Sequence, residues 1–195
     1  MRKKEKAPPG AKERILQTAV RLFRRQGYPA TGINQIIDES RTAKASFYQY
    51  FPSKDDLGRS FLDQYGSDQL QFLKNLTDRY EDPGQFIKAW LGILKREIRG
   101  GNFYGCMLAN LRAQMPDSSG PISRDLKSLT GRTLDLLEDY FKKLKEKGRL
   151  PRTLDPAGAS RRVFSVYEGV LQTWHLTGDA SALDDMLFLS ERIWK

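Results

Sequence analysis

The segment TAKASFYQYF, residues 42–51, combines side chains that can bond to a nucleic acid with side chains that usually fill a protein core. Its lysine, serine and glutamine can donate hydrogen bonds to phosphate oxygens or to the edges of bases. Its aromatic residues Phe47, Tyr48 and Tyr50 can either pack inside the protein or contact a partner outside it. The sequence PSKDDL follows directly and brings in Lys54. The chemistry to consider is therefore contact with a phosphate backbone.

The distribution of charge also favours a polyanion as the partner. The 195 residues have a formal net charge of +9. Residues 1–60 hold 13 basic and 6 acidic residues, a net of +7, whereas the remaining 135 hold 20 and 18, a net of +2. This asymmetry indicates nucleic acid or an anionic membrane surface. The alternative is a solvated basic tail, because residues 2–6 alone supply +3.

Several classes of protein are disfavoured by residues that the sequence lacks. Cys106 is the single cysteine and His175 the single histidine, so the sequence offers no disulfide framework, no cysteine-rich metal site and no histidine-based triad. A glycine-rich phosphate loop is also missing. We therefore expect no enzyme activity, no metal and no cofactor. No apolar run approaches the ~18 residues of a membrane span and no secretory signal is present, so we expect a cytoplasmic protein without a membrane partner.

Apolar residues at helical spacing predict an all-α protein of about nine helices. In the first helix the apolar positions fall at i, i+4, i+7 and i+8 from Ile15, and Gly27 and Pro29 prevent its extension. Ser53 is a suitable N-cap for a long helix that reaches about Leu76. The predicted helices cover residues 11–26, 33–39, 43–50, 54–76, 85–99, 103–115, 122–147, 156–176 and 181–194.

The last two of these helices have more apolar surface than one buried face requires. We infer that they pack both on the core of their own chain and on a second copy of it. The alternative is that both helices lie deep inside the monomer.

Residues 11–51 have the organisation of a helix-turn-helix unit, with one longer helix followed by two short ones that about four residues connect. Their sequence resembles the N-terminal domain of TetR-family transcriptional regulators over about residues 11–60. The similarity consists of a helix that ends in Phe-x-x-x-Gly-aromatic and of a later Tyr-x-Tyr-Phe-x-Ser-Lys-x-x-Leu pattern. The matching residues are Phe23, Gly27, Tyr28, Thr31, Ile33, Ile36, Lys44, Tyr48, Tyr50, Phe51, Ser53, Lys54 and Leu57.

We expect a basic disordered tail over residues 1–10. The resemblance implies a helix-turn-helix DNA-binding domain over 11–57 and a helical domain for ligand binding and dimerisation over 58–195. The segment GCMLANL, residues 105–111, is similar to a segment in one branch of the family. The function that follows is a homodimeric repressor that a small, partly apolar effector releases from a palindromic double-stranded DNA operator. The alternative is an architectural DNA-binding protein without an effector, and an internal apolar cavity would argue against it.

The sequence departs from the family pattern at the turn before the third helix, where family members usually have glycine, an aliphatic residue and then serine or threonine. This chain has Arg41, Thr42 and Ala43. Arg41 must therefore either accept a left-handed conformation, at a cost of about 1 kcal/mol, or the turn must differ locally. Because alanine cannot cap a helix, we expect Thr42 to do so.

The resemblance and the residue types together assign candidate contacts with DNA. Lys44 is a candidate for a phosphate or a guanine edge, Gln49 for an adenine or the backbone, and Tyr48 for a phosphate. Lys54 and Thr31 lie at helix N-termini, where we expect them to bind phosphate. We expect Phe47, Phe51 and Tyr50 to pack in the core. The full set of candidate DNA contacts is Thr31, Arg41, Thr42, Lys44, Ala45, Ser46, Tyr48, Gln49 and Lys54.

The candidates in the rest of the chain come from helical aromatic and aliphatic residues, which are more often plain core than ligand contacts. We expect Cys106 to be a buried, inert thiol rather than a redox sensor, and His175 to be a surface or interface residue. The candidate pocket residues are Trp90, Phe103, Met107, Asn110, Phe141, Tyr167 and Trp174. The candidate dimer-interface residues are Val163, Val170, Leu183, Leu187 and Phe188.

Overall fold

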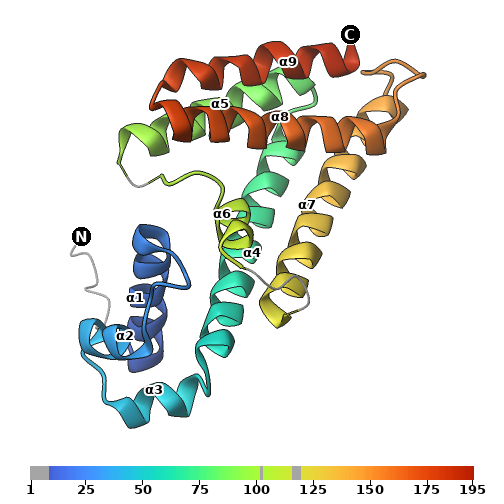
Figure 1. Ribbon diagram of the computed structural model, residues 1–195. Coiled ribbons are helices and arrows are strands. Elements are labelled where there is room, and N and C mark those ends of the chain that lie inside the picture. The colour runs from blue at the N-terminus through green and yellow to red at the C-terminus, as the bar shows by residue number, and fades with distance from the viewer. Residues whose placement is uncertain (1–8, 102, 116–119) are drawn as a thin grey trace, which may run out of the picture.

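The computed structural model describes residues 9–101, 103–115 and 120–195. These residues form nine α-helices and one 3₁₀ helix, and no strand occurs among them, which confirms the prediction of an all-α fold (Figure 1). The helices are α1 (Ala11–Gln26), α2 (Ile33–Ser40), α3 (Lys44–Tyr50), α4 (Lys54–Arg79), α5 (Pro83–Arg99), α6 (Met107–Ala113), α7 (Pro121–Glu146), α8 (Pro156–Thr177), η1 (Ala180–Asp184) and α9 (Asp185–Trp194).

The first three helices form a small head at one end of the molecule (Figure 1). Helix α1 is strongly amphipathic, and it buries the face that contains Ile15, Leu22 and Phe23. It ends at Gly27, whose φ of +87° lies in a region that side-chain-bearing residues rarely adopt. The sequence therefore fixes both the buried face of α1 and the point at which the chain turns towards α2.

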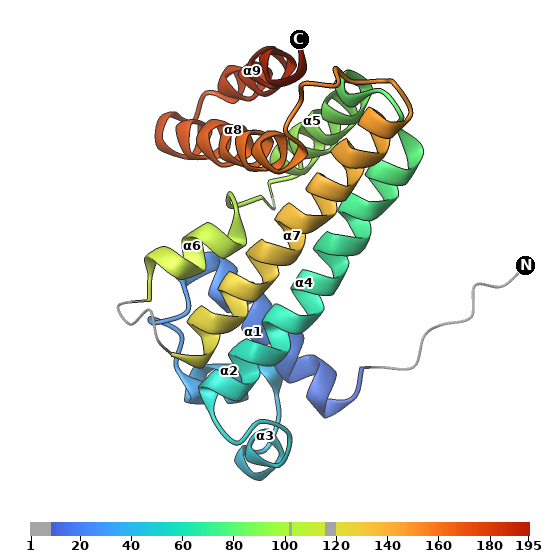
Figure 2. The same cartoon turned by 90° about the vertical axis from the view of Figure 1, so that its right-hand side faces the viewer.

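The long helices α4 and α7 lie side by side and connect the head to a layer formed by α5, α8 and α9 (Figures 1 and 2). Ser53 caps α4 as expected, because its hydroxyl accepts a hydrogen bond from the Asp56 backbone N–H at 3.1 Å. We call α5 to α9, together with the part of α4 after Leu62, the body. Helix α4 belongs to both parts, because Leu57 and Phe61 pack in the head core and Leu73 packs in the body core.

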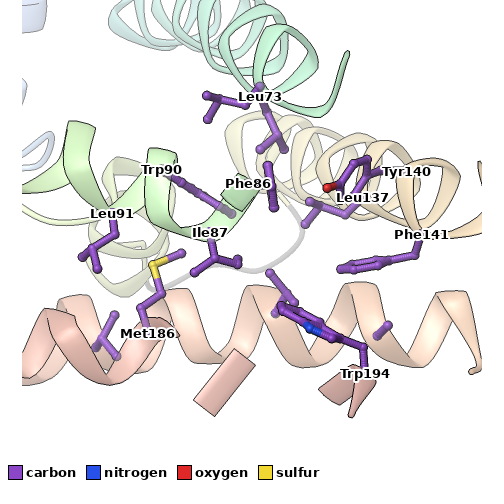
Figure 3. Packing of buried hydrophobic residues seen from close by; sticks show 14 of the residues in the cluster. Leu73, Phe86, Ile87, Trp90, Leu91, Leu137, Tyr140, Phe141, Met186 and Trp194 are labelled. Atoms are coloured by element: carbon purple, nitrogen blue, oxygen red, sulfur yellow. The ribbon is translucent and has the colours of Figure 1, made fainter. Parts of the chain in front are cut away.

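Two clusters of buried apolar residues hold the molecule together. The head core contains residues of α1, α2 and α3, and it continues through Leu57 and Phe61 of α4 into Met107 and Leu111 of α6 and Leu126 of α7. The body core unites α4, α5, α7, α8 and α9, and Figure 3 shows part of it. Leu108 of α6 packs against both cores. Helix α6 therefore lies where the two cores meet.

Two predicted helices differ from the observed ones. The helix predicted over residues 103–115 begins only at Met107, because Gly105 has a φ of +82° and the residues before it are not helical. The helix predicted over 181–194 starts with a 3₁₀ turn, which Asp179 caps by accepting a hydrogen bond from the Ser181 backbone N–H. The predicted disordered tail over residues 1–10 lies mostly outside the described residues.

Candidate nucleic-acid interface and candidate ligand cavity

Helix α3 has one buried side and one exposed side. Phe47 on the helix and Phe51 directly after it are fully buried in the head core, as expected. On the other side Lys44, Ala45 and Gln49 are exposed, Ser46 is half-buried, and Tyr48 is 42% exposed. The candidate DNA contacts on this helix therefore lie together on its exposed side, while its buried side attaches the helix to the head core.

Tyr50 is 40% exposed, so the expectation that it packs in the core was wrong. The reason is that α3 ends at Tyr50, and the backbone then becomes extended at Phe51, with a φ of −136°. Phe51 takes the second core position beside Phe47, with 6.1 Å between the ring centroids, and Tyr50 points away from it. Tyr50 therefore adds a second tyrosine to the exposed surface of α3.

The turn between α2 and α3 accepts a left-handed arginine. Arg41 has φ 51° and ψ 50°, and it is the single non-glycine residue with positive φ among the described residues. Its N–H donates to the Asp38 carbonyl and the Thr42 N–H donates to the Ile37 carbonyl, which is the pattern of a Schellman motif. The turn therefore keeps a geometry typical of glycine, at a cost of about 1 kcal/mol.

The prediction that Thr42 caps α3 was wrong. Ala43 occupies the N-cap position of α3 and makes no side-chain hydrogen bond. The Thr42 hydroxyl instead lies 2.8 Å from the Ser40 hydroxyl, inside the turn. The first N–H groups of α3 consequently lack a side-chain cap. Arg41 is exposed next to them, while Thr42 is half-buried.

The Thr31 side chain points inward rather than to the surface, which contradicts the expectation that it contacts phosphate. Thr31 is fully buried, and its hydroxyl donates to the Gly27 carbonyl at 2.7 Å. The side chain thus closes the turn between α1 and α2 and stabilises the head.

Lys54 lies at the N-terminus of α4, beside the turn between α1 and α2. Its ammonium lies 4.4 Å from the centroid of the Tyr28 ring and donates to the Pro29 carbonyl at 3.3 Å. Partial burial lowers the pKa of this ammonium. Tyr28 in turn donates its hydroxyl hydrogen to Asp55, the next residue of α4. The Lys54 charge is thereby held near the N-terminus of α4 within the head.

The same turn is also held from the other side, by α6. The Tyr28 backbone N–H donates to Gln114 Oε1 at 3.0 Å, directly after the end of α6. A Cβ atom on Gly27 would lie 2.6 Å from that oxygen, so a larger residue there would displace the Gln114 side chain. Gln114 therefore joins the end of α6 to the turn between α1 and α2 in the head.

A cavity of about 350 Å³ lies above the head, between α1, α4, α5 and α8. Four of the predicted pocket residues line it: Trp90, Phe103, Met107 and Tyr167. The other wall residues are Arg24, Tyr65, Asp68, Gln69, Phe72, Ile93, Leu94, Glu97, Tyr104 and Gly105.

Three predicted pocket residues do not line the cavity. Phe141 is fully buried in the body core, where its ring lies 6.0 Å from that of Trp194 (Figure 3). Trp174 packs against Phe103 from behind, with 5.5 Å between the ring centroids. The Asn110 amide donates to the Tyr104 carbonyl at 2.6 Å and so supports the wall from outside.

A polar cluster lies next to this cavity and includes Cys106. The thiol is buried, as expected, and burial together with the nearby Glu168 carboxylate raises its pKa to about 12. Burial also raises the pKa of Glu168 and that of the Tyr65 hydroxyl. A thiol that stays protonated is a poor nucleophile, which agrees with the expectation of an inert cysteine.

The predicted dimer-interface residues separate into two groups. Val163, Val170 and Leu183 were wrongly predicted, because all three are buried in the core of their own chain. Leu187 is half-buried and Phe188 is 56% exposed.

Two further large apolar residues of α8 and α9 are exposed, although they were not predicted as interface residues. They are Leu176, which is 75% exposed, and Leu189, which is 43% exposed. His175 is exposed as well, next to Leu176.

The part of the chain that the structure describes holds no group of three or more side chains that could bind a metal ion. None of the helices described is long and apolar enough to span a membrane.

Comparison with known proteins adds two matches to family models. Residues 15–60 match the model described as bacterial regulatory proteins, tetR family, and residues 84–187 match the model described as tetracyclin repressor-like, C-terminal domain. The first match contains the whole of α2 and α3, and the second contains most of the body.

Similar proteins agree with these matches. The HTH-type transcriptional regulator YxaF of Bacillus subtilis is 38% identical over 82 residues, which are 42% of this chain and 43% of that protein. An HTH-type transcriptional regulator encoded in the lacX 3′ region of Lactococcus lactis is 28% identical over 180 residues, 89% of this chain and 87% of that protein. The crystal structure of reduced NemR of Escherichia coli, an HTH-type transcriptional repressor, superposes with a TM-score of 0.83 at 20% identity and covers 95% of this chain and 98% of that one.

Proposed function

The chain belongs to the TetR family of bacterial regulatory proteins, which are helix-turn-helix transcriptional regulators, and on that premise we propose that it is a homodimeric repressor that a small molecule releases from a palindromic operator. The observation that carries the proposal is the division of α3 into a buried side and an exposed polar side.

The exposed side of α3 supports its role as the recognition helix. A major groove about 12 Å wide admits one α-helix. Phe47 and Phe51 attach α3 to the head, so that Lys44 and Gln49 are free to approach base edges and Tyr48 a phosphate. Ala45 is small and exposed, which permits close approach of the helix to the groove. Lys54 and Arg41 supply positive charge on either side of this helix.

The apolar surface on α8 and α9 supports a homodimer. Leu176, Phe188 and Leu189 are exposed on two helices that pack against each other. Exposed large apolar residues on neighbouring helices are typical of interfaces. A two-fold axis through this surface would pair two heads, and recognition helices about 34 Å apart match successive major grooves.

The cavity supports control by a small molecule rather than the effector-independent alternative. A volume of about 350 Å³ lies within the range of small-molecule sites. Its wall includes Arg24 of α1 and Met107 of α6, and both helices contribute to the head core. A ligand that prefers one arrangement of these helices would shift the spacing of the two heads.

The proposal is tested by selection of DNA from a randomised duplex library with the purified chain. We expect enrichment of a palindrome whose half-sites lie about one helical turn apart. A reporter gene behind the selected sequence should then be repressed when the chain is co-expressed. Enrichment of no sequence, or equal enrichment of unrelated duplexes, would contradict the proposal.

A further inference from the structure

The cavity wall is rich in aromatic rings. Trp90 and Tyr167 are stacked with 4.7 Å between their centroids and 25° between their planes. Tyr65 and Phe72 of α4 and Phe103 of the segment before α6 complete an aromatic lining. Such a wall favours a ligand with a flat, apolar body, because the rings offer faces for stacking and lose little conformational entropy.

The side chains of the cavity wall carry more negative than positive charge. Asp68 of α4 and Glu97 of α5 both line the cavity and are exposed to solvent, and neither makes an ion pair or side-chain hydrogen bond within the described residues. Arg24 of α1 is the one cationic residue of the wall as described, which leaves a formal charge of −1. The Glu168 carboxyl lies behind the wall, next to Cys106, Tyr65 and Tyr167.

Arg24 does not make the cavity suitable for an anion. Arg24 and Asp68 both also line a neighbouring cavity of about 230 Å³ between α1 and α4, so Asp68 accompanies Arg24 in both cavities and offsets its charge in each. An anion would meet two carboxylates and the negative faces of the rings. A cation would be attracted by both, since the face of an aromatic ring and a carboxylate each favour positive charge.

We propose that the effector of this regulator is an organic monocation with a flat aromatic body, seated between the stacked rings of Trp90 and Tyr167 and the carboxylates of Asp68 and Glu97. This inference rests on the proposed function only in taking the cavity as the effector site. It also gives the ligand a means to act on the head, because a cation in this position repels Arg24, which belongs to α1.

The test is calorimetric titration of the full chain with two probes of nearly the same shape, 10-methylacridinium, which is a cation, and acridine at pH 8.5, where it is neutral. DNA is left out, because acridines intercalate. We expect the cation to bind about tenfold more tightly than the neutral ring. Glu97→Gln and Asp68→Asn should each weaken binding of the cation about fivefold and leave that of acridine unchanged. Arg24→Gln should strengthen binding of the cation.

A matched control is Asp135→Asn, which removes an exposed carboxylate that lines a different groove, between α4 and α7. It should change neither affinity. The proposal is overturned if acridine binds as tightly as the cation, if neither probe binds, or if Glu97→Gln leaves the preference for the cation unchanged.

Selection of DNA by the unliganded chain distinguishes failure of this proposal about the effector from failure of the proposed regulatory function. A chain that selects a palindrome but shows no preference for the cation is a regulator with another class of effector. If the chain prefers the cation but selects no DNA, the assignment of the cavity stands and the proposed regulatory function is contradicted.

Discussion

The head core and the body core are both made of packed helices, yet they hold functional side chains in opposite ways. In the head, the core is complete and the candidate DNA contacts project from its outside, as Tyr48 does next to the buried Phe47. In the body, helix packing leaves an aromatic-lined cavity, and its candidate ligand contacts point inward. The head can therefore lose a functional side chain at little cost in stability, whereas several cavity residues also contribute to the body core.

The head also depends on the body for part of its core. The head core includes Met107, Leu111, Ile122 and Leu126 from the body helices α6 and α7. A change in α6 is therefore a change in the packing of the head. This asymmetry makes α6, together with Gln114 after it, the connection through which the cavity can influence the DNA-binding surface.

The largest expected effect is the loss of the hydrophobic attachment of α3. Phe47→Ala removes a fully buried ring from the head core and should lower the free energy of unfolding by about 3–5 kcal/mol. Denaturant unfolding followed by circular dichroism measures this. If the loss were below about 1 kcal/mol, α3 would not be anchored as described.

A smaller effect is expected where a charge is removed from the outside of the head. Lys54→Ala should weaken DNA binding about tenfold in a dimer, and it should reduce the slope of log affinity against log salt by about two. Fluorescence anisotropy at several salt concentrations measures both quantities. Lys142→Ala, an exposed lysine on α7, is the matched control and should leave the slope unchanged. If the slope for Lys54→Ala were unchanged, Lys54 would not contact a DNA phosphate.

The connection between the two regions is tested at Gln114. Gln114→Ala leaves the Tyr28 N–H without its acceptor, which should cost about 1 kcal/mol of stability and weaken the effect of a cavity ligand on DNA binding. Gln114→Glu retains the accepting oxygen and should behave like the parent chain. If both variants respond to the ligand as the parent does, the connection runs elsewhere.

The smallest expected effect, and one of opposite sign, concerns the turn before α3. Arg41→Gly should raise the free energy of unfolding by about 1 kcal/mol, because glycine adopts the left-handed conformation without strain. It should also weaken DNA binding severalfold, because a cation is lost beside α3. Arg41→Lys is the control that keeps the charge and the strain. A less stable Arg41→Gly variant would show that the arginine side chain stabilises the turn.

The sequence predicted the head better than the body for a physical reason. In α1 and α2 one face is buried and the other exposed, so the period of the apolar residues identifies directly which side chains pack in the core. Tyr50 was one exception, because α3 is too short to show a period and its second core aromatic, Phe51, lies beyond the helix end. Thr31 was misjudged because a threonine at a helix N-terminus can bond inward to the Gly27 carbonyl as well as outward to phosphate.

In the body, a helix meets different neighbours along its length, and periodicity no longer separates their roles. Helix α4 contributes Phe61 to the head core, Phe72 to the cavity wall and Leu73 to the body core. The stripe on α8 that contains Val163 and Val170 has the same spacing whether it faces its own chain or a partner. One signal was available for the cavity: Ile93, Leu94 and Glu97 follow Trp90 at intervals of three, four and seven on α5.

The most direct test of the account is the effect of Tyr48→Ala on two quantities measured on one preparation. These are the affinity for the selected palindromic duplex, by fluorescence anisotropy, and the midpoint of thermal unfolding. Because Tyr48 lies on the exposed side of α3, we predict that affinity falls at least about tenfold while stability changes by less than about 1 kcal/mol. An unchanged affinity for the duplex would contradict the assignment of α3 as the helix that contacts DNA.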